Sequence, residues 1–224
     1  MDDDHDLKDF NNVSRLFPLP GVVLFPHAIL PLHIFEPRYR QMSEDALASD
    51  RFITVVQFRP PSEWVSPTEP ALEEYGCLGR IFNHERLPDG RFNFLLIGRK
   101  RVRLTREVAS GKLYRMSEVR VIDDILPEEP YDSQRSDLIT AFRNVVQGRV
   151  DPDLDALFET EPPLGLLTDI VAQALGLPAS IKQSLLAEPR VITRAVELLG
   201  VLRQIGTLPP IDERATFPPP FSRN

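Results

Sequence analysis

The chain has little cysteine and no long apolar run. These two shortages argue against a disulfide-linked protein and against a membrane-spanning one. Cys77 is the only cysteine among 224 residues, which excludes an intramolecular disulfide and agrees with a reducing compartment. No window approaches the ~18 consecutive apolar residues of a membrane helix, so we expect no membrane association. The N-terminus from Met1 to Asp6 is acidic, unlike the basic start of a secretory signal. These features predict a cytoplasmic protein.

Sequence motifs for nucleotide and metal chemistry are missing as well. A phosphate-binding loop requires G-x-x-x-x-G-K-[ST], but the only Gly-Lys pair, Gly111-Lys112, is followed by Leu113, and Arg106 occupies the first glycine position. The four histidines, at positions 5, 27, 33 and 84, lack metal-ligand spacing, and one cysteine cannot complete a zinc site. We therefore expect a non-enzymatic protein without catalytic residues, metal or cofactor.

The charge is unevenly distributed along the chain. The net charge of −7 argues against a general nucleic-acid binder, yet residues 80–120 contain eleven Lys/Arg and four Asp/Glu. Arg99, Arg101 and Arg103 alternate in a predicted strand and would share one face, and Arg106 extends the run. Phosphate contacts by these residues give the alternative function, RNA binding. The run lacks the interleaved aromatic residues that stack on single-stranded bases, so nucleic acid is the less favoured partner.

Residues 13–126 have the pattern of β structure with one inserted helix. Two apolar, proline-containing pieces, 15–19 and 28–34, predict short extended segments, and Pro37 suits the start of a helix. Further strands are predicted over 52–58, 78–85, from 92 through 104, and 114–125, with a hairpin turn at residues 88–90. About six strands with one helix predict a small, partly closed barrel.

The apolar period changes after Pro130, and residues 127–205 are predicted to form an α-helical bundle. Ser133 is expected to cap a first helix that Gly148 ends. Three further helices are predicted, over 164–175, from Pro178, and over 191–205. We expect residues 1–12 to be a disordered acidic tail and residues 206–224 to be a proline-rich tail. The predicted fold class is therefore α+β.

The apolar stretch over residues 16–42 carries a family resemblance. Its runs FPL (17–19), VLFP (23–26) and LPLHIFEPRY (30–39) resemble the signature of the N-terminal, substrate-binding domain of Lon proteases. The resemblance covers residues 13–205 and implies a PUA-like β pseudo-barrel followed by a helical bundle. It also implies binding of unfolded or exposed apolar protein segments, or docking on a partner such as a separate Lon-type protease. The chain would be a stand-alone member without ATPase or peptidase modules.

The expected binding site is an apolar groove between the barrel and its first helices. Phe35, Arg38 and Tyr39 are the candidate peptide contacts there; alternatively, Glu36 pairs with an arginine to fix the helix start and Tyr39 packs on the barrel. Trp64, in the proline-rich loop over 59–74, is either an aromatic anchor for a partner or a cap on the barrel.

Overall fold

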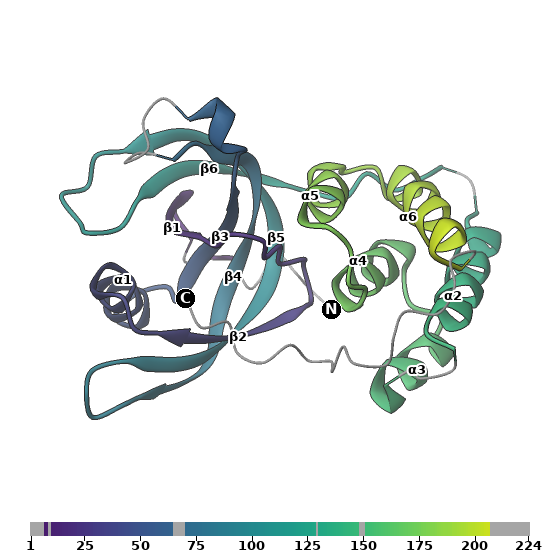
Figure 1. Ribbon diagram of the computed structural model, residues 1–224, viewed down its shortest axis with the longest axis horizontal. Helices are drawn as coiled ribbons and strands as arrows, with labels where there is room; N and C mark the ends of the chain where they lie inside the picture. The colour runs from purple at the N-terminus through teal and green to yellow at the C-terminus, as the bar shows by residue number, and fades with distance from the viewer. Residues whose placement is uncertain (1–6, 9, 65–69, 129, 148–150, 207–224) are drawn as a thin grey trace. The chain divides into compact units, whose positions relative to one another are not determined.

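The computed structural model describes residues 7–8, 10–64, 70–128, 130–147 and 151–206, and over these the fold is α+β (Figure 1). Its strands and helices are β1 Val13–Pro18, β2 Ile29–Ile34, α1 Pro37–Leu47, β3 Phe52–Phe58, β4 Leu72–Arg86, β5 Phe92–Val108, β6 Met116–Ile122, α2 Asp132–Val145, α3 Pro152–Glu159, α4 Leu164–Ala174, α5 Ala179–Ala187 and α6 Val191–Gly206. A short 3₁₀ helix, Pro61–Glu63, precedes β4.

The strands close into a barrel because β5 is long enough to have three neighbours. The sheet order is β2-β5-β4-β3-β1-β6, and β6 also pairs with β5. The half of β5 over 101–108 pairs with β6 and closes the ring, whereas the half over 92–97 pairs with β2. Every pairing is antiparallel except that of β1 with β3. The predicted barrel with one inserted helix is confirmed.

Side chains from four strands fill one centre of the barrel. Phe52, Leu78, Val102 and Val119 form a buried cluster, as the alternation of a strand with one interior face requires. Leu7 and Phe10 pack against this cluster, with the Phe10 and Phe52 rings 5.4 Å apart. Packing against the barrel core thus begins within residues 1–12, which we expected to form a disordered tail. Residues 1–6 and 9 of this segment lie outside the described residues.

A tight turn before β2 crosses β5 at Gly98. His27 N–H donates to the Gly98 carbonyl at 2.8 Å, and Gly98 N–H donates to the Ala28 carbonyl at 2.9 Å. A Cβ at Gly98 would lie 2.0 Å from the Phe25 carbonyl oxygen, so only glycine allows this approach. The turn leads into β2, whose Pro31 is tolerated because β2 pairs only with β5 among the described strands.

The outer face of β4 and β5 carries a buried ion pair. Arg101 is 3% exposed and binds Asp169 of α4, with one nitrogen–oxygen distance of 3.0 Å. Its Nε also donates to the carbonyl of Leu186 in α5 at 3.1 Å. Burial alone would lower the pKa of Arg101, but Asp169 holds it above its usual value. This guanidinium therefore ties residues 169–189 to the β5 half that closes the barrel.

Two compact units divide the chain differently from our prediction. The barrel unit consists of residues up to 125 together with 169–189, and the helical unit contains 126–168 and the segment from 190 onward. We predicted one helical bundle over 127–205, but α5 and the second half of α4 belong to the barrel unit. Arg101 explains the difference, because its charge and donors are satisfied by those helices.

The helical unit is built around the pairing of α2 with α6. Phe142 of α2 meets Phe158 of α3 edge to face, with ring centroids 5.7 Å apart. Helix α3 was missed, although Asp151-Pro152 is a start signal: the Asp151 carboxylate accepts the Asp153 N–H at 2.9 Å. The predicted cap at Ser133 is wrong, because α2 begins at Asp132 and the Ser133 hydroxyl bonds Gln134.

Substituting Gly98 by alanine should destabilise the barrel unit, because the new methyl group would overlap the Phe25 carbonyl. We expect the free energy of unfolding to fall by about 1–3 kcal/mol. Gly200 of α6 is the control, since no atom beyond its chain neighbours and its own helix backbone lies within 4 Å of its Cβ position. Gly200→Ala should stabilise the protein by about 0.5–1 kcal/mol. Urea unfolding followed by circular dichroism measures both; equal effects would contradict the crossing at Gly98.

Removing one partner of the buried ion pair should lower the free energy of unfolding more than removing both partners. Arg101→Met leaves the Asp169 carboxylate buried without its partner and should lower the free energy of unfolding by about 3–5 kcal/mol. The double variant Arg101→Met/Asp169→Leu should be clearly more stable than the single one. Fluorescence of Trp64, the only tryptophan, reports denaturant unfolding of this unit. If the loss in the double variant equalled the sum of the losses in Arg101→Met alone and Asp169→Leu alone, the two side chains would not interact.

Candidate functional site

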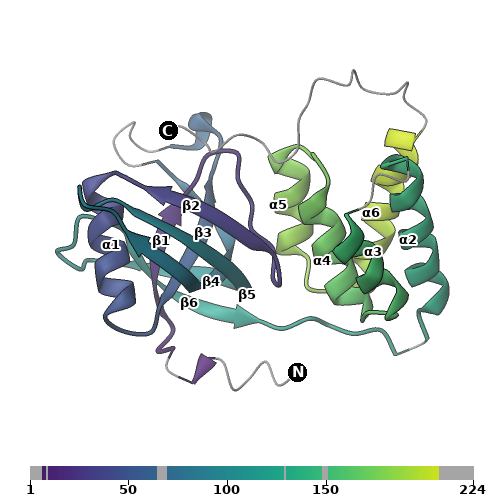
Figure 2. The ribbon, with the colours of Figure 1, turned by 90° about the horizontal axis from the view of Figure 1, so that it is seen from below.

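The outer face of β2 and of the adjoining half of β5 carries apolar side chains that are exposed or partly exposed. Along β2 the even-numbered residues point inward, so Ile29, Pro31 and His33 point outward, and Ile29 is 56% exposed. Ile29 pairs with Ile97 and Pro31 with Leu95, which places these side chains on one face. Figure 2 shows β2 lying along the β4–β5 pair. Such a contiguous apolar area is typical of a binding surface.

A bulge in β4 adds an aromatic ring to this face. The register of β4 and β5 shifts between Ile81 and Asn83, which leaves Phe82 as the extra residue. Bulges re-aim a side chain, and Phe82 is 68% exposed and shares a pocket with Ile97. We call the surface made of Ile29, Pro31, Phe82, Leu95 and Ile97 the apolar strand face.

One end of the apolar strand face opens into a pocket rich in arginine. The pocket has a volume of about 250 Å³. Its lining residues are Arg51, Arg80, Ile81, Phe82, Ile97 and Arg99. Three arginine side chains beside three apolar ones favour a ligand that combines an anionic group with an apolar one.

The other end of the face is polar. His33 Nδ1 lies 2.7 Å from Asn93 Oδ1, and the Asn93 amide donates to Glu85 at 3.3 Å, so three strands contribute to one row. Arg91 Nη1 lies 3.3 Å from His33 Nε2. Phe35, the next outward residue after His33, stacks on that imidazole with ring centroids 6.3 Å apart. The face therefore changes from apolar to polar along β2.

The predicted peptide contacts at the start of α1 are divided between surface and core. Phe35 is 39% exposed, and Arg38 is exposed while pairing with Glu36 at 2.9 Å. Tyr39 is buried against Phe17, with ring centroids 4.5 Å apart, and burial raises the pKa of its hydroxyl. These contacts correspond to the structural alternative for Glu36 and Tyr39, whereas Phe35 and Arg38 can still reach a ligand.

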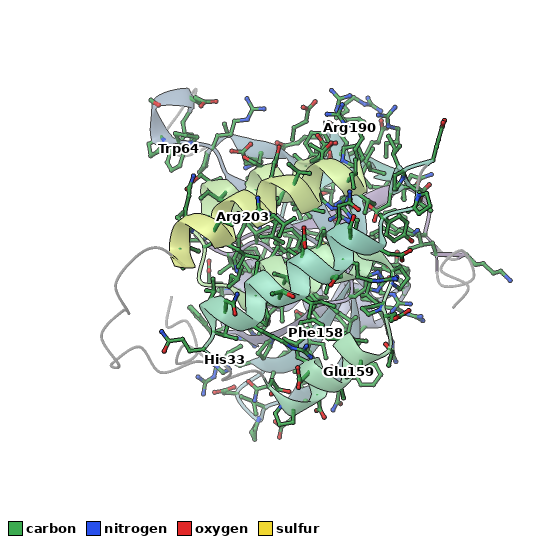
Figure 3. The ribbon with its side chains drawn as sticks, turned by 90° about the vertical axis from the view of Figure 1, so that its right-hand side faces the viewer. His33, Trp64, Phe158, Glu159, Arg190 and Arg203 are labelled. Carbon is green, nitrogen blue, oxygen red and sulfur yellow. The ribbon has the colours of Figure 1, made fainter. Side chains whose placement is uncertain are left out.

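Trp64 packs on its own part of the chain. Its indole N–H donates to the Arg59 carbonyl at 2.8 Å, and its ring lies 6.1 Å from that of Phe58. In Figure 3, Trp64 lies near the top of the view and His33 well below it, both on the left. The structure therefore does not bring Trp64 together with Phe35, and a partner held by both would have to be large.

The basic strand does not form one exposed cationic face. Arg101 is buried, Arg103 bonds Glu74 at 2.7 Å, and Arg106 pairs with Glu118. Arg99 lies where the register between β4 and β5 shifts, and it lines the pocket at the apolar strand face. Of the four residues proposed for RNA, Arg99 lines the described pocket, together with two further arginines and three apolar residues.

Two kinds of chemical site, metal clusters and reactive cysteines, have no support in the part of the chain that the structure describes. In this part of the chain no three His, Cys, Asp or Glu side chains are placed to hold a metal ion. The Cys77 thiol is buried, and burial raises its pKa well above the usual range, which disfavours the reactive thiolate. Among the described helices, none is long and apolar enough to cross a membrane.

Sequence reasoning missed Ile29, Phe82 and Ile97. Ile29 and Pro31 alternate with inward residues, which is a weak signal of a face, but the sequence alone does not say which half of β5 remains uncovered. Phe82 lies next to Ile81 and Asn83, and no residue there marks a bulge. Bulges depend on the pairing of two strands and are therefore hard to predict from one of them.

Comparisons with known proteins match this architecture. The family model "ATP-dependent protease La (LON) substrate-binding domain" matches residues 13–204. A Lon protease of Xanthomonas oryzae pv. oryzae is 29% identical over 192 residues, which cover 84% of this chain and 22% of that protein. A Lon protease of Geobacter metallireducens is 28% identical over 181 residues, covering 78% and 22%. The chain thus spans less than a quarter of the length of these relatives.

Solved structures show the same fold. A Lon N-terminal domain protein from Xanthomonas campestris superposes with a TM-score of 0.59 at 24% identity, covering 84% of this chain and 97% of that one. The N-terminal domain of a Mycobacterium avium complex Lon protease gives a TM-score of 0.64 at 16% identity, covering 87% and 98%. The family model spans both the barrel and the helices, and it describes a substrate-binding domain, which is the non-catalytic part of Lon. The chain belongs to the LON substrate-binding domain family.

Proposed function

We propose that this protein binds exposed apolar segments of other polypeptides on the apolar strand face. The observation that carries the proposal is the exposure of Ile29 and Phe82 beside Pro31, Leu95 and Ile97 on one face. Burying such side chains against a peptide is favourable by about 25 cal/mol per Å² of apolar surface. Membership of a substrate-binding family supports polypeptide as the ligand.

The face, rather than the edge of β2, is the proposed contact surface. Pro31 has no N–H, so an added strand would find a donor missing in the middle of β2. Side chains that point outward from Ile29 to Phe35 span about 20 Å, the length of six or seven extended residues. The polar row at His33, Asn93 and Glu85 offers hydrogen bonds to the backbone of such a peptide. Phe35 and Arg38 would contact its far end.

The proposed role is non-enzymatic and cytoplasmic. The protein would hold client polypeptides without modifying them, either alone or for a separate Lon-type protease. RNA binding by Arg99, Arg101, Arg103 and Arg106 is the less favoured function, because three of these four residues pair with carboxylates. A salt titration separates the functions, since phosphate contacts weaken steeply with salt and apolar contacts do not.

Removing the ring of Phe82 should weaken peptide binding. We expect Phe82→Ser to reduce affinity about tenfold or more for an acetylated, amidated octapeptide of alternating Val and Thr that carries a neutral dye. Leu113→Ser is the matched control, because Leu113 is 64% exposed and lies outside the apolar strand face. Fluorescence anisotropy at 50 and 500 mM salt measures both variants. Equal losses in the two variants, or no binding by the parent protein, would rule out this surface.

A further inference from the structure

The pocket at the end of the apolar strand face combines positive charge with apolar walls. Arg51, Arg80 and Arg99 line it together with Ile81, Phe82 and Ile97, and no carboxylate is among these lining residues. Guanidinium groups remain protonated at any physiological pH and bind carboxylates in a planar, bidentate manner. A ligand that fits both halves of this lining carries an anionic group directly beside an apolar one.

The backbone of Arg51 is fixed beside β4. Its φ angle is +65°, a conformation that is costly for a residue other than glycine. Two hydrogen bonds hold it there: Arg51 N–H donates to the Ala46 carbonyl, and Ile81 N–H donates to the Arg51 carbonyl, both at 2.9 Å. The second bond ties Arg51 to the residue before Phe82. The backbone of Arg51 is thus fixed at the pocket before any ligand binds, while its side chain is exposed.

Arg80 and Arg99 enter the pocket from the two strands that form its floor. Arg80 pairs with Ile97, and its guanidinium lies 5.8 Å from the centre of the Phe52 ring. Arg99 lies at the register shift next to Gly98, where β5 leaves its regular pairing with β4. Both arginines also make other interactions within the protein, so Arg51 is the side chain best placed to adapt to a ligand.

We propose that this pocket binds the free C-terminal carboxylate of a polypeptide whose last residue is apolar. The inference rests on the proposed function, because the preceding residues of the ligand would lie on the apolar strand face. Charge complementarity identifies the carboxylate, and Phe82 and Ile97 identify the apolar side chain beside it. Inorganic phosphate would use the arginines but would leave the apolar half of the lining without a partner. The protein would therefore prefer chain ends to internal segments.

The test compares two forms of one peptide on the full chain. An octapeptide of alternating Val and Thr ending in Leu, with a neutral N-terminal dye, is prepared as the free acid and as the amide. Charge-assisted hydrogen bonds to arginine should make the acid bind about tenfold more tightly. Arg51→Gln should remove this preference and leave the amide's affinity unchanged. Arg106→Gln, which removes an exposed cation far along β5, should keep the preference.

Each outcome separates this inference from the proposed function. Equal binding of acid and amide, both weakened by Phe82→Ser, would overturn the carboxylate site and keep the apolar strand face. Failure of both peptides to bind would overturn both proposals. Loss of the acid's advantage in 10 mM inorganic phosphate, at constant ionic strength, would indicate a general anion site and would also overturn the inference. Arg51→Lys, which keeps the charge but not the planar fork, should retain only part of the preference.

Discussion

The buried guanidinium of Arg101 holds parts of two helices against the barrel. It takes its partners from Asp169 and Leu186, so α4 and α5 lie over this half of β5. Beyond the register shift at Arg99 the same strand continues to Ile97. Ile97 pairs with Arg80, three residues from Cys77, the partner of Arg101, so Ile97 lies on the opposite face of the sheet from Arg101. A buried charge must be paired, whereas an apolar face can remain open at a modest cost. The helices therefore cover one face of β5 near Arg101, and the apolar strand face lies on the other face, beyond the register shift.

Irregular strand pairing shapes the half of β5 that carries the apolar strand face. The register shift near Gly98 separates the two halves of β5, and the shift at Phe82 sends an aromatic ring to the surface. Gly98 also lets the turn at Phe25 cross β5, which places β2 beside it and adds Ile29 and Pro31 to the face. The apolar strand face thus follows from a few backbone constraints, and any polypeptide bound there would meet a preformed surface.

The sequence predicts the regular parts of this fold and little of its candidate site. The β-branched run from Phe52 to Phe58 and the apolar period from Val191 onward give β3 and the start of α6 without error. The position of α5 was not predictable, because it depends on how Arg101 is neutralised by a residue 68 positions away. The surroundings of the candidate site residues were hard to predict for a similar reason. Tyr39 looks like a surface aromatic in sequence, yet it packs on Phe17, whereas Phe82 is exposed by a bulge that no residue type marks.

The most direct measurement of the central claim is methyl NMR of the isoleucine side chains during peptide titration. Ile29 and Ile97 lie on the apolar strand face, while Ile125 is equally exposed at 56% and lies outside it. With the amidated Val/Thr octapeptide, our account predicts shifts at Ile29 and Ile97 that saturate together and none at Ile125. Saturating shifts confined to Ile125 or to other residues outside the face would contradict it.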